Sequence, residues 1–310
     1  MSQFEAPTSK LPNEFMPDPA TVPHSFDFHA VMTAQASVTK VALGPQGKLD
    51  VADGSLPPGL IAGPQPDTFD PYKVKELTCP ENPTLSPERF LPSVNKYIEQ
   101  DREKSIGHVE TVFFGSSTIA YWKEDPKANQ KEDLETTFKN IGALNRGVGG
   151  TTLSDLDKFA EDLVLKHTPE RVILYAGTND IAEGHDSDKV FEDFRKLEQR
   201  IHGTSTTEPK LPGASPDIKL YIIGMIPAPC REVLEDKFHL YDDGNAKIKQ
   251  YTRNIPNTFY IDPTPSVADR TGHLDPGRFM EDHLHPKQDV YRILAGIIKR
   301  DIAADEVGTP

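Results

Sequence analysis

The chain has 310 residues, enough for one large domain or two small ones, and carries a formal net charge of −14 at pH 7. Nucleic acid and anionic membranes require a basic surface, so the charge argues against both partners. No stretch approaches the roughly 20 apolar residues that cross a bilayer, and the N-terminus lacks the pattern of a secretory signal. We therefore expect a cytoplasmic protein with no transmembrane segment and no nucleic-acid partner.

Proline separates a first region from the rest of the chain. Of the 28 prolines, 15 fall in residues 1–95, where few long helices are compatible with them. Only residues 31–51 suggest strands there, in the form of a hairpin. We predict a proline-rich extension at 1–86 that either wraps the main domain or is partly disordered, a main domain at 87–304 and a C-terminal tail at 305–310.

Short apolar runs alternate with amphipathic helices from about Pro87 onward. The runs are too short for helices, rich in β-branched and aromatic residues and largely non-alternating, as in strands buried on both faces of a parallel sheet. They cover residues 112–114, 171–176, 219–226 and 258–261. Apolar stripes at helical spacing cover residues 90–98, 153–163, 190–201 and 290–298. This alternation predicts an α/β sandwich with a mostly parallel sheet, in which ligands bind beyond the carboxyl ends of the strands.

Candidate catalytic residues lie in two segments. One follows the first predicted strand, and the other precedes the last predicted helix. Ser116 and Ser117 follow the first strand. A serine hydroxyl is a weak nucleophile until a base takes its proton, and the base needs an orienting partner. Asp282 and His285 are three residues apart, so the carboxylate can accept from Nδ1 and leave Nε2 facing a serine.

Two further loops can supply hydrogen-bond donors to a developing oxyanion. The glycine-rich segment "NRGVGGTT", residues 145–152, can present backbone N–H groups at the start of a helix that Thr151 or Thr152 caps. Asn179 follows the strand "RVILYA" and offers a side-chain amide. Trp122, the only tryptophan, is interpreted as a packing residue rather than a substrate contact.

These four segments, in this order, resemble the SGNH, or GDSL-type, serine hydrolase family over about residues 87–304. "VFFGSSTIAYW" matches the first block of the family and places the nucleophile on Ser117. "NRGVGGTT" and "YAGTNDI" match the second and third blocks and place oxyanion donors on Gly150 and Asn179. "DHLHP" matches the fifth block, so that Asp282 and His285 complete the triad.

The resemblance implies a fold and a mechanism. The fold is a three-layer α/β/α sandwich with a mostly parallel, five-stranded sheet of flavodoxin-like type. Ser117 then attacks an ester carbonyl with His285 as general base, and no metal or cofactor takes part. The family's usual Gly-Asp-Ser is here Gly-Ser-Ser, so Ser116 stands at the aspartate position as a structural hydroxyl. Gly149 remains a rival to Gly150 as oxyanion donor.

Other functions on the same residues remain open. A carbohydrate O-acetylesterase, a thioesterase and an acyltransferase would use the same triad, and a binding protein could keep it without turnover. A metal-dependent hydrolase could use His283 and His285 but needs metal ligands after the first strand, where none stands. A dinucleotide site at Gly147 and Gly149 lacks its third glycine, since residue 152 is Thr.

Substrate choice is expected to lie in residues 227–244, a long segment of mixed polarity that leaves the catalytic edge of the sheet. Its candidate lining residues are Arg231, Phe238, His239 and Tyr241. The partner is a small-molecule ester. Cys79 and Cys230 are too few for a disulfide framework and are not spaced as metal ligands, and the sequence identifies no partner for Cys230.

Overall fold

A computed structural model describes residues 86–123, 133–230, 238–268 and 274–308, and the structural statements below concern these residues. The predicted extension at 1–86, with the strands expected at 31–51, therefore lies outside the described residues apart from its last position. The predicted limits of the main domain, 87–304, stay a prediction.

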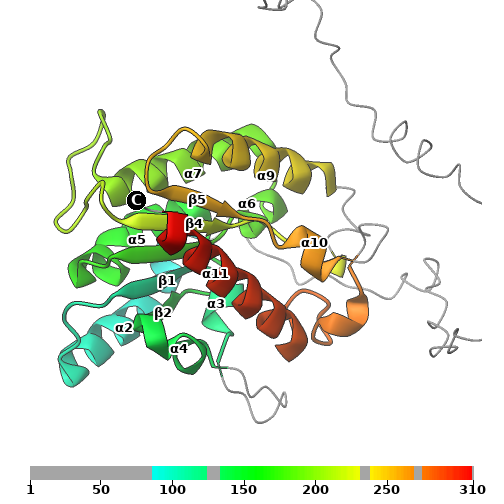
Figure 1. Ribbon diagram of the computed structural model, residues 1–310, viewed down its shortest axis with the longest axis horizontal. Helices are drawn as coiled ribbons and strands as arrows, with labels where there is room; N and C mark the ends of the chain where they lie inside the picture. Colours follow the sequence, from blue (N-terminus) through cyan, green and yellow to red (C-terminus); the bar gives the residue numbers. More distant parts are fainter. Residues whose placement is uncertain (1–85, 124–132, 231–237, 269–273, 309–310) are drawn as a thin grey trace, which may run out of the picture. The chain divides into compact units, whose positions relative to one another are not determined.

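One parallel sheet of five strands forms the centre of the described chain, in the order β2-β1-β3-β4-β5 (Figure 1). The strands are β1 Thr111–Gly115, β2 Ala143–Gly147, β3 Arg171–Tyr175, β4 Lys219–Ile223 and β5 Thr258–Ile261. Parallel pairing needs a crossover between strands, which the intervening helices provide. Four strands match the apolar runs of the sequence, whereas β2 was not predicted.

Helices cover both faces of the sheet. On one face lie α2 (Leu91–Lys104), α5 (Leu153–Leu163), α7 (Ser187–His202) and α9 (Phe238–Thr252). On the other lie α3 (Ser117–Ala120), α4 (Leu134–Thr137), α10 (Thr264–Val267) and α11 (Gln288–Gly308). The described part of the chain also contains short elements, namely α6 (Thr178–Ala182) and the 3₁₀ helices η3 (Pro87–Phe90), η4 (Lys139–Ile141), η5 (Leu165–His167) and η6 (Pro276–Arg278). The predicted three-layer α/β/α sandwich is confirmed.

Strand β1 contributes to two apolar cores because successive side chains point to opposite faces. Val112 and Phe114 of β1 pack under α2 and α5, and Phe113 between them packs with Trp122 and the helices of the other face. Burial on both faces explains why these strands lack a polar/apolar alternation. Trp122 is fully buried and stacks on a tyrosine of α11, as its packing role predicts.

The end of β2 packs closely against the last residues of α3. A Cβ added to Gly147 would lie 2.2 Å from the backbone nitrogen of Ala120, so only glycine allows this approach. The Asn145 amide donates to the Ile119 carbonyl at 2.8 Å, and its oxygen accepts from the N–H of Gly147 at 2.9 Å. These contacts hold the glycine-rich loop beside α3, where Ser117 begins the helix.

Residues 238–244 form the first half of α9, although residues 227–244 were expected to be a connecting segment. Tyr241, Gly244 and Ile248 recur at spacings of three and four and face the core under α9. The helical pattern is hard to recognise in the sequence because Gly244, on the apolar face of α9, is not a large apolar residue. Met225 packs against this glycine. Gly244 leaves room there, since an added Cβ would lie 2.8 Å from the Met225 Cε.

Cys230 is fully buried and disulfide-bonded. The sequence predicted no disulfide framework, and the other cysteine, Cys79, lies outside the described residues. Disulfides persist in oxidising compartments and are rare in the cytosol. The cytoplasmic location stays a prediction. No helix within the described ranges has the length and apolar character needed to span a membrane.

Candidate active site

The two serines after β1 differ in exposure. Ser116 has an extended backbone, is 1% exposed and donates its N–H to the Tyr175 carbonyl at 3.2 Å. Ser117 is the first residue of α3, is partly exposed and lines a small pocket together with Asn179 and Leu284. The turn therefore buries the first hydroxyl and presents the second at the carboxyl edge of the sheet.

Asp282 and His285 form a close pair in the loop before α11. The imidazole Nδ1 lies 2.6 Å from one carboxylate oxygen of Asp282. The other carboxylate oxygen accepts the N–H groups of Leu284 and His285 at 2.9 and 3.0 Å. Burial alone raises the pKa of Asp282, but these backbone and imidazole hydrogen bonds together hold it below its usual value. Asp282 thus stays ionised at neutral pH and fixes the orientation of the imidazole.

Tyr121 connects this loop to the helix that begins at Ser117. Its N–H donates to the Ser117 carbonyl at 2.8 Å, and its ring lies edge-on to the His285 ring with centroids 4.7 Å apart. The side chain remains 41% exposed. We did not predict a role for Tyr121. The available signal was its position four residues after Ser117, because residues at that spacing share one face of a helix.

The glycine-rich loop lies against the serine. A Cβ added to Gly149 would stand 3.8 Å from the Ser117 Cβ. Gly150 has a φ of 82°, a value that favours glycine, and its carbonyl accepts from the Arg89 guanidinium at 3.1 Å. Among the described residues, the backbone N–H groups of Gly149 and Gly150 have no hydrogen-bond acceptor. Both remain available to a ligand, so the structure leaves the choice between them open.

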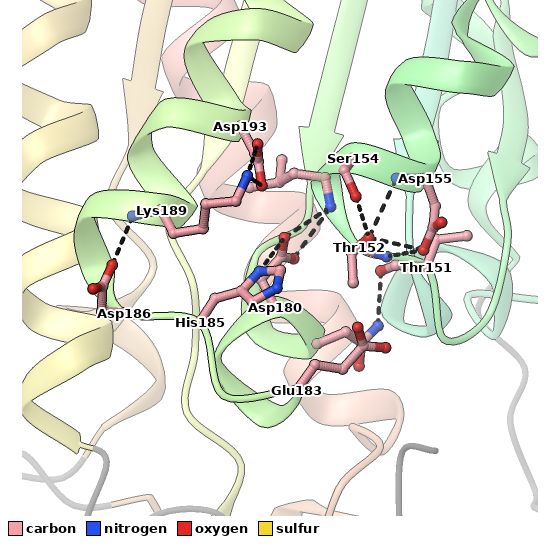
Figure 2. A network of polar contacts seen from close by, with 12 residues as sticks. Thr151, Thr152, Ser154, Asp155, Asp180, Glu183, His185, Asp186, Lys189 and Asp193 are labelled. Carbon is pink, nitrogen blue, oxygen red and sulfur yellow. Dashed lines mark hydrogen bonds and ion pairs between the residues drawn. The ribbon is translucent and has the colours of Figure 1, made fainter. Parts of the chain in front are cut away.

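Asn179 and Asp180, at the start of α6, hold that loop from the other side. The Asn179 amide donates to the Thr151 carbonyl at 2.9 Å, which uses one of its two hydrogens. Asp180 is fully buried, and its two oxygens lie 3.1 and 3.2 Å from the N–H of Leu153, the first residue of α5. Figure 2 shows Asp180 between the start of α5 and His185. Asn179 and Asp180 thus hold the glycine-rich loop, residues 145–152, against the start of α6.

A polar cluster extends from Asp180 toward α7. Asp180, His185 and Asp193 each place one potential ligand atom within 4.8 Å of the other two. Among the described residues, this is the group that could hold a metal ion. The Asp180 carboxylate, 3.8 Å from the His185 Nδ1, raises the pKa of His185, and burial raises the pKa of Asp180 despite that partner. The Lys189 ammonium lies 2.5 and 2.7 Å from the two Asp193 oxygens (Figure 2). Lys189 therefore occupies the position that a cation would need at Asp193.

Of the four candidate lining residues, Tyr241 borders the pocket beside Ser117. Phe238 and His239 lie at the start of α9, the latter exposed, and neither borders this pocket. Arg231 lies outside the described residues. Tyr241 is buried under α9, whereas His239, two residues earlier, points to the opposite side of the helix.

Residues 113–293 match the model of the GDSL-like Lipase/Acylhydrolase family, which is more than half of the chain. The chain matches no curated protein. A three-layer α/β/α protein with a serine and an Asp–His pair at one sheet edge is typical of an ester hydrolase. The chain belongs to the GDSL-like lipase/acylhydrolase family and is a carboxylic ester hydrolase of the SGNH type.

Several solved structures share the fold. A candidate acylhydrolase from Bacteroides fragilis aligns with a TM-score of 0.55 and 22% identity, covering 68% of this chain and 96% of that one. A candidate platelet activating factor from Streptococcus pneumonia aligns with a TM-score of 0.56 and 15% identity, covering 69% of this chain and 92% of that one. A GDSL-like lipase from Bacteroides thetaiotaomicron aligns with a TM-score of 0.53 and 21% identity, covering 68% of this chain and 98% of that one. At these identities the structures establish a common fold.

Proposed function

We propose that the protein hydrolyses small-molecule carboxylic esters through an acyl-enzyme on Ser117. The observation that carries this proposal is the convergence of four loops at one edge of the sheet. Ser117 shares a pocket with Asn179 and with Leu284, the neighbour of His285, and the imidazole is anchored on an ionised Asp282. A nucleophile, a base with its orienting group and an amide donor are the components of acyl transfer.

In the proposed first step the Ser117 Oγ attacks the carbonyl carbon while the His285 Nε2 takes its proton. The Asp282 carboxylate stabilises the imidazolium that forms. The tetrahedral intermediate then collapses, the bond to the leaving oxygen breaks, and His285 gives its proton to the alcohol. Water attacks the acyl-enzyme by the same route in reverse, which releases the acid and restores Ser117.

The proposed oxyanion donors are the N–H of Ser117, the N–H of Gly150 and the Asn179 amide. The Ser117 N–H has no acceptor within α3 because it belongs to the first residue of the helix. The Gly150 N–H is available, and the Asn179 amide keeps one hydrogen after its bond to Thr151. Each such donor is typically worth about 3 kcal/mol in the transition state. Gly149 is the alternative to Gly150.

The same residues support a carbohydrate O-acetylesterase, a thioesterase or an acyltransferase, which differ in the group that leaves or in the acceptor of the acyl group. The remaining alternative, a binding protein that does not turn over, differs in the reactivity of Ser117. A test of that reactivity therefore separates the enzyme from the binding protein without knowledge of the natural substrate.

We expect a fluorophosphonate probe to label the wild-type protein at one site, Ser117, because a serine paired with a base attacks the probe's phosphorus. Labelled peptides are identified by mass spectrometry. Ser116→Ala provides the matched control and is expected to remain labelled, whereas Ser117→Ala is expected to lose the label. A folded wild-type protein that does not react, or that reacts at Ser116, would contradict the proposal.

A further inference from the structure

The pocket beside Ser117 is very small. It has a volume of about 20 Å³, and the residues that border it include Ser117, Asn179, Tyr175, Ile226, Tyr241 and Leu284. A cavity of roughly 10–15 Å³ holds one water-sized group. This pocket can therefore hold a methyl group but not an extended alkyl chain.

The floor of the pocket is fixed by buried hydrogen bonds. Tyr175 is 3% exposed, its hydroxyl oxygen accepts the N–H of Ile226 at 3.3 Å, and its O–H points to the Ile226 carbonyl at 3.5 Å. Burial raises the pKa of Tyr175 to about 12, so the phenol stays neutral. To deepen the pocket here, a ligand would have to break these contacts and leave buried polar groups unpaired.

The two remaining walls are held by secondary structure and by the catalytic loop. Tyr241 is 1% exposed and belongs to the core beneath α9. Leu284 directly precedes His285, and its N–H donates to Asp282 at 2.9 Å, so its main chain cannot move away without disturbing the triad. These lining residues are therefore costly to displace.

The position of the pocket assigns it to the acyl part of the substrate. In the tetrahedral intermediate the former carbonyl carbon bears the Ser117 oxygen, the oxyanion, the leaving oxygen and the acyl chain. The oxyanion must face the donors, and the leaving oxygen must face His285, which protonates it. Of the four substituents, only the acyl chain is then left to enter the pocket. On the His285 side, the 41% exposed Tyr121 borders open surface that suits a larger alcohol.

We infer, on the basis of the proposed function, that the enzyme takes esters of short acyl groups, with acetyl preferred over longer acids. Tyr175, Ile226, Tyr241 and Leu284 set this limit. The alcohol part, in contrast, lies toward the open surface at Tyr121 and is not restricted by this pocket.

The test compares kcat/KM for p-nitrophenyl acetate, butyrate and octanoate, with Ser117→Ala as the blank for each ester. Wild type is expected to favour acetate over octanoate by about 10²-fold, because a closed pocket discriminates strongly against added methylenes. Octanoate cleaved by Ser117 as well as acetate would overturn the inference but leave the proposed function standing. Absence of any Ser117-dependent cleavage would instead count against the proposed function itself.

A substitution in the lining of the pocket tests whether this pocket holds the acyl group. Leu284→Ala keeps the backbone N–H to Asp282 but removes one wall, so the ratio of butyrate to acetate cleavage is expected to rise about tenfold. Leu211→Ala is the matched control, since Leu211 is also partly buried but packs against the opposite core. An unchanged ratio in the folded Leu284→Ala protein, or an equal change in Leu211→Ala, would show that this pocket does not hold the acyl group.

Discussion

Replacement of Ser117 by alanine is expected to lower kcat for p-nitrophenyl acetate by about 10⁶-fold, the loss seen when the nucleophile of a serine triad is removed. Ser117 is the partly exposed serine at the end of β1, and its hydroxyl borders the pocket that Asn179 shares. The side chain makes no structural hydrogen bond among the described residues, so the variant is expected to fold. Circular dichroism and the melting temperature check this point.

Two comparisons separate loss of chemistry from loss of structure. Ser116→Ala removes a hydroxyl that is 1% exposed but keeps the N–H that bonds to Tyr175, so a much smaller loss is expected. His285→Ala is expected to lose about as much as Ser117→Ala, and the double variant no more than either, because the two residues act as one unit. Multiplied losses, or a larger effect at Ser116, would contradict the assignment of the nucleophile.

Asn179→Ala is the second substitution with a large expected effect, a loss of about 10²–10³ in kcat with a small change in KM, as for other oxyanion donors. The substitution removes the amide hydrogen that is left after the bond to Thr151, and it also removes that bond, which orients the side chain. A donor used mainly in the transition state affects kcat more than substrate binding. A rise in KM at constant kcat would contradict this role.

Asp180 is expected to act through the same clamp without contacting the substrate. Its buried carboxylate holds the N–H of Leu153, and the adjacent Asn179 holds the Thr151 carbonyl, so both secure the loop that carries Gly150. Asp180→Ala is expected to lower kcat, and its effect is expected to shrink strongly in the Asn179→Ala background, since residues in one network are not additive.

The matched control for Asp180 is Asp193→Ala, which removes a carboxylate of the same polar cluster. Asp193 is 3% exposed and pairs with Lys189 on α7, away from the glycine-rich loop. Its loss is expected to lower the melting temperature while kcat stays close to wild type. Additive losses for Asp180 and Asn179, or an equal loss of kcat in Asp193→Ala, would show that Asp180 is structural only.

Burial explains which strands could be predicted from the sequence. Residues 111–115 of β1 are all buried and mostly apolar, which makes the strand recognisable. In β2, Asn145 and Arg146 interrupt the apolar run, and the fold satisfies them through contacts that sequence patterns do not reveal. Asn145 bonds to the backbone of α3, and the Arg146 guanidinium pairs with the buried Asp101 of α2. A strand stabilised by such long-range polar contacts has no local signature.

The site shows the same limit. Motif order was sufficient to select Ser117 and the Asp282–His285 pair as candidates, because these residues lie in contiguous blocks. The substrate side depends on packing between distant segments. Trp122 and Tyr121 are adjacent aromatics, yet the first is fully buried and the second lies exposed beside His285. Only the direction of a short helix decides which of the two reaches the site.

The central claim is that turnover passes through an acyl group on Ser117, and the most direct measurement is to trap that group. Wild-type protein is mixed with p-nitrophenyl acetate, quenched in acid during turnover and digested, and the peptides are weighed by mass spectrometry. We expect one acetyl group, located on Ser117 and absent from the Ser117→Ala protein. Turnover accompanied by an acetyl group on another residue, or by none at any quench time that kinetics predicts to be populated, would contradict the account.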